Sequence, residues 1–264
     1  FEEVLNSGQP DFPFCLSWAN ASWSEKMWRV DGTHEKRILV EQLYPGDEDI
    51  VAQFNYLLPA FKDKRYIRIN NKPIFMVYNP LFHPNIERYI DIFRSLAKES
   101  GLDGVYLVGQ TFLDSDIENI HKKGFDAVNI CRLYDKLHSR SIVKRVYDRM
   151  LRIGLGRPLV DQYKKVIHYL TSTRDRLEYV IPTIMPNWDH TPRSGTGGYV
   201  FHNSTPELFK KHVEMVLETV KDKPEEERLV FIKSWNEWGE GNYLEPDLRY
   251  GKAYLDKLKE VLKD

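Results

Sequence analysis

Apolar and polar positions alternate along the chain in two patterns. Short runs of β-branched and aromatic residues without a helical period predict buried strands, and most are followed by stretches with an apolar period of three to four residues. The strand candidates are Phe12–Ala19, Pro73–Tyr78, Gly104–Gly109, Phe125–Cys131, Tyr179–Met185 and Arg228–Ser234.

Helical patterns fill most of the intervals between these strands. Gly101 predicts the end of the second helix, and S-T-P-E at 204–207 is a typical helix start. A longer helical tract, 139–173, separates the fourth and fifth strands and is broken near 154–158. The other predicted helices are Asp47–Lys62, Asn85–Ser100, Asp114–Lys122, Pro206–Val220 and Tyr250–Leu262.

Strands that alternate with helices imply a parallel sheet covered by helices, either an open doubly wound sheet or a (β/α)8 barrel. Polar and aromatic residues stand at the C-terminal ends of most of the strands, where barrel enzymes hold their sites. No glycine-rich phosphate loop follows any strand, which disfavours a dinucleotide fold. The predicted fold class is therefore α/β, a TIM-type (β/α)8 barrel.

The predicted barrel is two strands short, and the chain starts at Phe1 within an apparent helix end. We therefore expect a truncated barrel that lacks its first two βα units. Residues 1–264 would form a single domain comprising the C-terminal six units. The open edge of such a sheet would invite self-association.

Composition excludes several classes of function. The formal charge is −1, with 38 basic and 39 acidic residues, which gives no electrostatic case for a nucleic-acid partner. The histidines are scattered without HExxH or CxxC, so we expect no metal site and no cofactor. No apolar stretch approaches the ~18–20 residues of a membrane span. Cys15 and Cys131 are far apart, so we expect free thiols and a cytoplasmic location.

The segment W-N-E-W-G-E-G-N-Y-L-E-P at 235–246 follows the apolar run at 229–232 and carries the most chemistry. Trp235 and Trp238 offer flat apolar faces for sugar rings, and Asn236 can bond hydroxyls. Glu237 and Glu240 are three residues apart and could work as one protonated and one ionised carboxylate. The alternative is that the tryptophans are core residues and the glutamates are solvated loop charges.

Four segments together resemble the WbsX-like glycosyltransferase family, whose domain is similar to the barrel of glycoside hydrolase family 99, the endo-α-mannosidases. They are F-C-L-S-W-A-N-A-S-W at 14–23, F-K-D-K-R-Y-I-R-I-N-N-K-P-I-F at 61–75, P-N-W-D-H-T-P-R at 186–193 and W-N-E-W-G-E-G-N-Y-L-E-P-D at 235–247. The resemblance implies that Glu240 is the acid/base at the glycosidic oxygen. It also implies that Glu237 assists attack of the sugar 2-hydroxyl on C1, giving an anhydro-sugar intermediate and net retention.

Further candidates for substrate binding stand at other strand ends. Trp18, Asn20 and Trp23 end the first strand, with Trp28 further into the loop. Indole faces and an amide are typical of sugar sites, although the tryptophans could instead plug the barrel mouth. Tyr78, at the end of the second strand, is a subsite candidate, as are Gln110 and Tyr134.

Trp188, Asp189 and Arg193 follow the fifth strand. Asp189 could accept hydrogen bonds from sugar hydroxyls, and Arg193 could hold a phosphate. An ion pair between Asp189 and Arg193 is the alternative. The D-x-D patterns at 47–49 and 114–116 resemble the metal-binding motif of nucleotide-sugar transferases, but both stand where helix N-termini favour acids, and we expect that role.

Three functions fit these residues. The family resemblance favours an enzyme that forms or rearranges glycosidic bonds in surface polysaccharide biosynthesis, of the lipopolysaccharide or O-antigen type, with a glycan or sugar as substrate. The alternative, implied by the carboxylate pair and the hydrolase-like barrel, is a retaining hydrolase of α-linked glycans. A non-catalytic glycan-binding module is the third reading.

Overall fold

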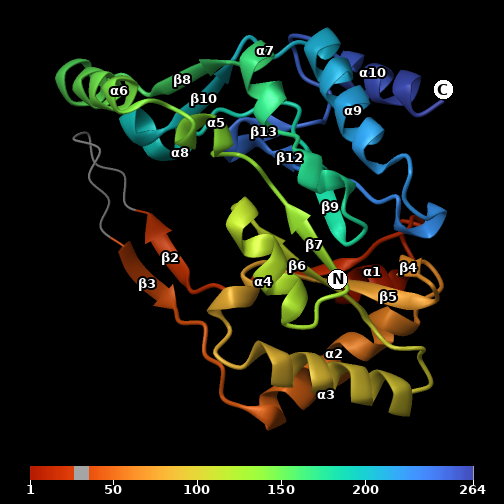
Figure 1. The fold of residues 1–264 in the computed structure, drawn as a ribbon. Helices are drawn as coiled ribbons and strands as arrows, with labels where there is room; N and C mark the ends of the chain where they lie inside the picture. The colour runs from red at the N-terminus through yellow and green to blue at the C-terminus, as the bar shows by residue number, and fades with distance from the viewer. Residues whose placement is uncertain (27–35, 264) are drawn as a thin grey trace.

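The structure is a computed structural model that describes residues 1–26 and 36–263. Its central sheet contains six parallel strands that neighbour one another in chain order, which confirms the predicted parallel sheet (Figure 1). In order, these are β1 (Leu16–Trp18), β5 (Lys72–Val77), β6 (Tyr106–Thr111), β7 (Ala127–Ile130), β9 (Val180–Ile184) and β11 (Phe231–Ile232). A doubly wound sheet reverses its strand order at a switch point, whereas a barrel keeps chain order, so this sheet is of the barrel type.

In the described part of the chain, the parallel ladder ends at β1 on one side and β11 on the other. The result is a curled half-barrel, as expected for six strands of a TIM-type fold. A short antiparallel strand, β4 (Arg68–Ile69), pairs with the start of β5.

Side chains along the six strands alternate between the inside and the outside of the half-barrel. On β5, Phe75 and Val77 pack outward against helices, whereas Ile74 and Met76 belong to a separate cluster on the inner face. The inner residues become polar towards the C-terminal strand ends, where Gln110 and Thr183 line a cavity. The alternation therefore gives the half-barrel an apolar base and a polar mouth.

Helices cover the outer face of the sheet. The bounds of α2 and α9 coincide with the predicted ones, and Thr205 caps α9 by accepting a hydrogen bond from the backbone of Leu208. The described helices are α1 (Glu2–Ser7), α2 (Asp47–Lys62), α3 (Ile86–Glu99), α4 (Ile117–Lys122), α5 (Asp135–His138), α6 (Ile142–Leu155), α7 (Tyr163–Val166), α8 (Thr191–Ser194), α9 (Pro206–Val220) and α10 (Ala253–Val261). None of the described helices is long and apolar enough to span a membrane.

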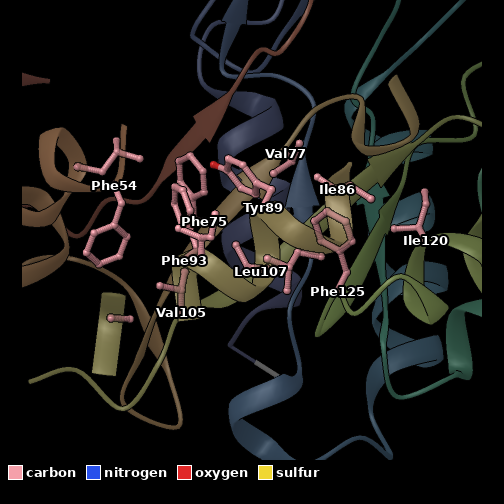
Figure 2. Close-up of a cluster of buried hydrophobic side chains, with 14 of the residues drawn as sticks. Phe54, Phe75, Val77, Ile86, Tyr89, Phe93, Val105, Leu107, Ile120 and Phe125 are labelled. Carbon is pink, nitrogen blue, oxygen red and sulfur yellow. The ribbon is translucent and has the colours of Figure 1, made fainter. Parts of the chain in front are cut away.

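An aromatic cluster joins the sheet to α2 and α3 on the outer side (Figure 2). Phe93 is fully buried, with its ring centroid 4.3 Å from that of Tyr89, 5.3 Å from that of Phe54 and 5.8 Å from that of Phe75. Offset and edge-on contacts of this kind add to the burial of apolar area. We call these four residues the aromatic cluster; they fix the first half of the sheet.

Among the described residues, three small two-stranded sheets were not predicted. Pairing is parallel between β8 (Leu159–Gln162) and β10 (Tyr199–His202) and antiparallel in the other two, β2 (Trp23–Lys26) with β3 (Lys36–Val40) and β12 (Asn236–Glu237) with β13 (Asn242–Tyr243). The expected helical tract at 139–173 is broken as predicted, by the left-handed Gly156 that ends α6. It is wrong at Leu159–Gln162, where β8 forms before helical turns resume at α7. A four-residue segment is too short to show whether its apolar residues repeat with the period of a strand or of a helix.

The two D-x-D patterns lie in first helical turns, as expected. Residues 47–49 begin α2, and residues 114–116 form the short turn η2 (Asp114–Asp116) before α4. Their carboxylates bind arginines: Asp47 pairs with Arg88, and Asp114 pairs with the buried Arg132 at 2.8 Å. The expected capping role is wrong, because no side-chain capping hydrogen bond forms at either turn; the acids lie in first helical turns, where their charge is favourable.

Candidate active site

The motif at 235–246 folds back on itself directly after β11. Its first residues form β12, the next three form the turn η7 (Trp238–Glu240), and the chain returns as β13, with Asn236 opposite Tyr243. β11 is anchored to the sheet because the backbone of Lys233 donates to the carbonyl of Ile184 at 2.9 Å. The motif thus stands at the C-terminal end of a strand of the parallel sheet, as in barrel enzymes.

Buried amides hold the returning chain in place. The side-chain nitrogen of Asn242, a fully buried residue, donates to the carbonyls of Asn187 and Lys233 at 2.7 and 2.9 Å. The side chain of Asn187 in turn bonds both the N–H and the C=O of Tyr243. The hydroxyl of Ser234 donates to the carbonyl of Asn242 and accepts from the backbone N–H of Glu237. The segment after β9 and the motif are therefore locked together.

Gly241 permits the close approach of these two segments. Its φ of 51° lies in the left-handed region, which suits glycine. A Cβ at this position would lie 2.7 Å from the Cβ of Asp189 and 2.9 Å from its carbonyl oxygen. The second glycine of W-G-E-G is therefore required both by backbone conformation and by packing.

Arg193, on α8, joins the two carboxylates of the motif. Its Nη1 lies 2.8 Å from Oε1 of Glu240, and its Nη2 lies 3.0 Å from Oε1 of Glu237. The alternative of an ion pair between Asp189 and Arg193 is wrong, because Oδ1 of Asp189 accepts hydrogen bonds from the N–H and the hydroxyl of Thr191, at 2.9 and 2.6 Å. Phosphate binding by Arg193 stays a prediction.

Two residues that sequence reasoning missed complete the surroundings of Glu240. Lys233 Nζ lies 3.4 Å from Oε2 of Glu240, and His190 Nε2 lies 3.6 Å from its Oε1. The ring of His190 stacks on that of buried Trp188, and Lys233 lies over the same indole. Residues two apart in a strand face the same side of the sheet. Lys233 could therefore have been identified from the sequence, because it lies two residues after Phe231, whose side chain faces the inside of the half-barrel.

A cavity of about 240 Å³ opens next to this cluster inside the half-barrel. Its lining includes Tyr78, Gln110, Cys131 and Lys233. Burial and the nearby charge of Glu240 raise the pKa of Tyr78, and the same two causes raise that of Tyr134. Burial raises the pKa of Cys131 to about 11, so that thiol is protonated at neutral pH. Lys233 is the one charged side chain among the described residues that line the cavity, and the polar groups beside it can form hydrogen bonds.

The tryptophans of the motif are not core residues. Trp235 is 51% exposed and Trp238 is 46% exposed, which contradicts the core alternative for both. Trp238 stacks on Tyr243 with centroids 3.7 Å apart, and its Nε1 donates to Oε2 of Glu245 at 2.7 Å. Asn236 is exposed beside them. These side chains present apolar planes and an amide to solvent around the carboxylates.

The candidates at the end of β1 have different surroundings. Trp18 stacks on Tyr89 of α3, with centroids 5.3 Å apart. The amide of buried Asn20 donates to the carbonyl of Asn79 and accepts from its N–H, which ties the ends of β1 and β5 together. Trp23 lies on β2 and is 68% exposed. None of these three has a described contact with Glu237 or Glu240, so their role in binding stays a prediction; the Trp28 candidate falls outside the described residues.

The comparisons with solved structures agree with the fold. A glycoside hydrolase-like protein is 18% identical with a TM-score of 0.51, over 80% of this chain and 60% of its own. The endo-α-mannosidase of glycoside hydrolase family 99 from Bacteroides thetaiotaomicron, in complex with bis-tris-propane, is 14% identical with a TM-score of 0.50, over 83% of this chain and 68% of its own. At these identities the likeness shows a shared TIM-type architecture.

Sequence comparison gives the family. The model for the family described as Glycosyltransferase WbsX matches residues 1–258. This chain belongs to the WbsX glycosyltransferase family. It is 27% identical over 252 residues to uncharacterized protein WxcX of Xanthomonas campestris pv. campestris, covering 95% of this chain and 34% of WxcX. The chain thus spans about a third of the length of the curated relatives it matches.

Proposed function

We propose that this protein forms or rearranges glycosidic bonds in the biosynthesis of a surface polysaccharide of the lipopolysaccharide or O-antigen type, with Glu237 and Glu240 as its catalytic pair. One observation carries the proposal: Arg193 holds both carboxylates together at the C-terminal end of a barrel strand. Because one guanidinium group bonds both carboxylates, it fixes their relative geometry. The half-exposed indoles of Trp235 and Trp238 beside them supply faces on which a sugar ring can rest.

The two carboxylates differ in their surroundings. The side chain of Glu240 is 14% exposed and is contacted by three basic side chains, whereas that of Glu237 is 41% exposed and is bound by Arg193. In the proposed first step, Glu237 takes the proton of the sugar 2-hydroxyl while that oxygen attacks C1. Glu240 gives a proton to the departing glycosidic oxygen, and the C1–O bond breaks.

The second step reverses these proton transfers. The hydroxyl of an acceptor sugar attacks C1 and gives its proton to the carboxylate of Glu240. The anhydro ring opens, and the 2-oxygen recovers its proton from Glu237. No carboxylate attacks carbon, so the distance rule that separates retaining from inverting glycosidases does not apply to this route. We place the reaction in the cytoplasm, in keeping with two free cysteines.

A product assay tests the reaction type. The whole protein is incubated with glycan acceptors, with and without a pool of nucleotide-sugars, and the products are identified by mass spectrometry. The proposal predicts glycans lengthened or rearranged by whole sugar units. Shortened glycans alone would instead identify a hydrolase, in which water takes the place of the acceptor. Glycan binding with no product under any condition would identify a binding module and contradict the proposal.

A further inference from the structure

Helix α6 is inverted relative to an ordinary surface helix. In a globular protein, the apolar stripe of a helix normally faces the core. On α6, the only buried residue is Asp148, and the apolar side chains other than half-buried Leu151 are exposed. The exposed fractions run from 53 to 79% for Ile142, Val143, Val146, Tyr147, Met150, Ile153 and Leu155.

Ion pairs explain the inversion. Arg140, buried beneath α6, bonds Asp148 at 2.6 Å and Asp161 of β8 at 2.5 Å. Lys144 also pairs with Asp148, at 2.8 Å. The polar side of α6 is therefore fixed to the body of the protein. Residues four or three apart, such as Ile142, Val146, Met150 and Ile153, form a stripe on the opposite side.

The remaining charges on α6 are all positive. Asp148 is its only acidic residue, and it is occupied by the ion pairs. Arg145, Arg149 and Arg152 are exposed and line, with Arg140, a cavity of about 630 Å³ beside the helix. Figure 1 shows α6 at an extremity of the molecule, where a broad surface can reach it.

We propose that α6 and its arginines, the α6 surface, dock this protein onto an anionic phospholipid membrane. An exposed apolar stripe bordered by cations is the signature of a helix that lies in the membrane–water interface. The apolar side chains would enter the boundary between headgroups and acyl chains, and the arginines would bind lipid phosphates. Charge complementarity favours an anionic membrane as the partner, because the exposed charged residues beside the apolar stripe are all positive.

Vesicle flotation tests the α6 surface with the whole protein, and no glycosyl-transfer activity enters the assay. Vesicles of phosphatidylcholine in which about one third is replaced by phosphatidylglycerol are compared with pure phosphatidylcholine vesicles. One variant carries Val146→Asp and Ile153→Asp, and another carries Arg149→Glu and Arg152→Glu. These four side chains are exposed, so thermal melts of both variants should match that of the parent protein.

The proposal predicts flotation with the anionic vesicles, weakened by high salt and reduced roughly tenfold or more in both variants. A charge control, Lys62→Glu with Lys98→Glu on the exposed sides of α2 and α3, should float like the parent. Absence of flotation, equal flotation with neutral vesicles, or equal loss in the control would overturn the proposal. A dimer in light scattering that Val146→Asp dissociates, without vesicle binding, would show instead that a second copy covers α6.

Discussion

The aromatic cluster and the carboxylate site are held together in opposite ways. Phe93 is buried among several rings, so its position is fixed by many weak contacts. Glu240 is positioned by a few polar groups, chiefly Arg193 and Lys233. The rings of the aromatic cluster are buried, whereas Trp235 and Trp238 of the carboxylate site are half exposed. The comparison indicates that the aromatic cluster contributes chiefly to stability, whereas the motif after β11 presents the reactive groups.

The largest expected effect on stability lies in the aromatic cluster. Phe93→Ala should lower the free energy of unfolding by about 3–5 kcal/mol, because it removes a fully buried ring and leaves a cavity. Trp235→Ala, at a 51% exposed ring, should change it by no more than about 1 kcal/mol while weakening glycan binding. Urea unfolding and a glycan-binding assay measure the two. Similar losses of stability in both variants would contradict this difference between the aromatic cluster and the carboxylate site.

A smaller effect comes from a buried histidine behind the site. His212 Nε2 accepts from the backbone N–H of Met185 at 3.2 Å, and burial lowers its pKa to about 3. As the pH falls below ~6.5, the unfolded chain gains a proton that the folded protein does not, so stability present at neutral pH is lost. The slope should be about 1.4 kcal/mol per pH unit between roughly pH 6 and pH 4.

His212→Gln should remove that slope, because glutamine does not titrate. The control is His168→Gln, at an exposed position, which should retain the parent's slope. Chemical denaturation at several pH values measures both. If the His212→Gln curve runs parallel to that of the parent down to pH 4, the histidine is not held neutral in the folded protein.

A matched pair of glycines isolates the packing of the site loop. Gly241 and Gly251 both have left-handed φ angles, 51° and 55°, so alanine at either costs roughly 1–2 kcal/mol in backbone strain. Only at Gly241 would the added Cβ also meet Asp189, because nothing lies within 4 Å at Gly251. Gly241→Ala should therefore be less stable than Gly251→Ala by about 1 kcal/mol or more. Equal melting curves for the two variants would show that the loop can shift to accommodate the added Cβ without loss of stability.

The spacing of apolar residues predicted the part of the molecule around the aromatic cluster well. There, apolar residues of α2 and of the strands repeat with helical or strand spacing over many residues. The sheet β8–β10 escaped prediction because four-residue strands carry too little pattern. For the carboxylate site, the sequence predicted the residues but not how they pair. Which acid Arg193 would bind depends on how α8 is placed against η7, and local sequence spacing does not encode that distance.

The central claim is that Glu237 and Glu240 carry out glycosyl transfer, and Glu240→Gln tests it most directly. Glutamine keeps the size of the side chain but cannot deliver the proton, so turnover should fall at least about a hundredfold, roughly 3 kcal/mol in barrier height. Glycan binding should survive. The matched control is Glu245→Gln, in the same motif, which can still accept from Trp238 and should retain turnover. A Glu240→Gln rate near that of the parent protein would contradict the mechanism and leave the half-exposed tryptophans as a binding surface.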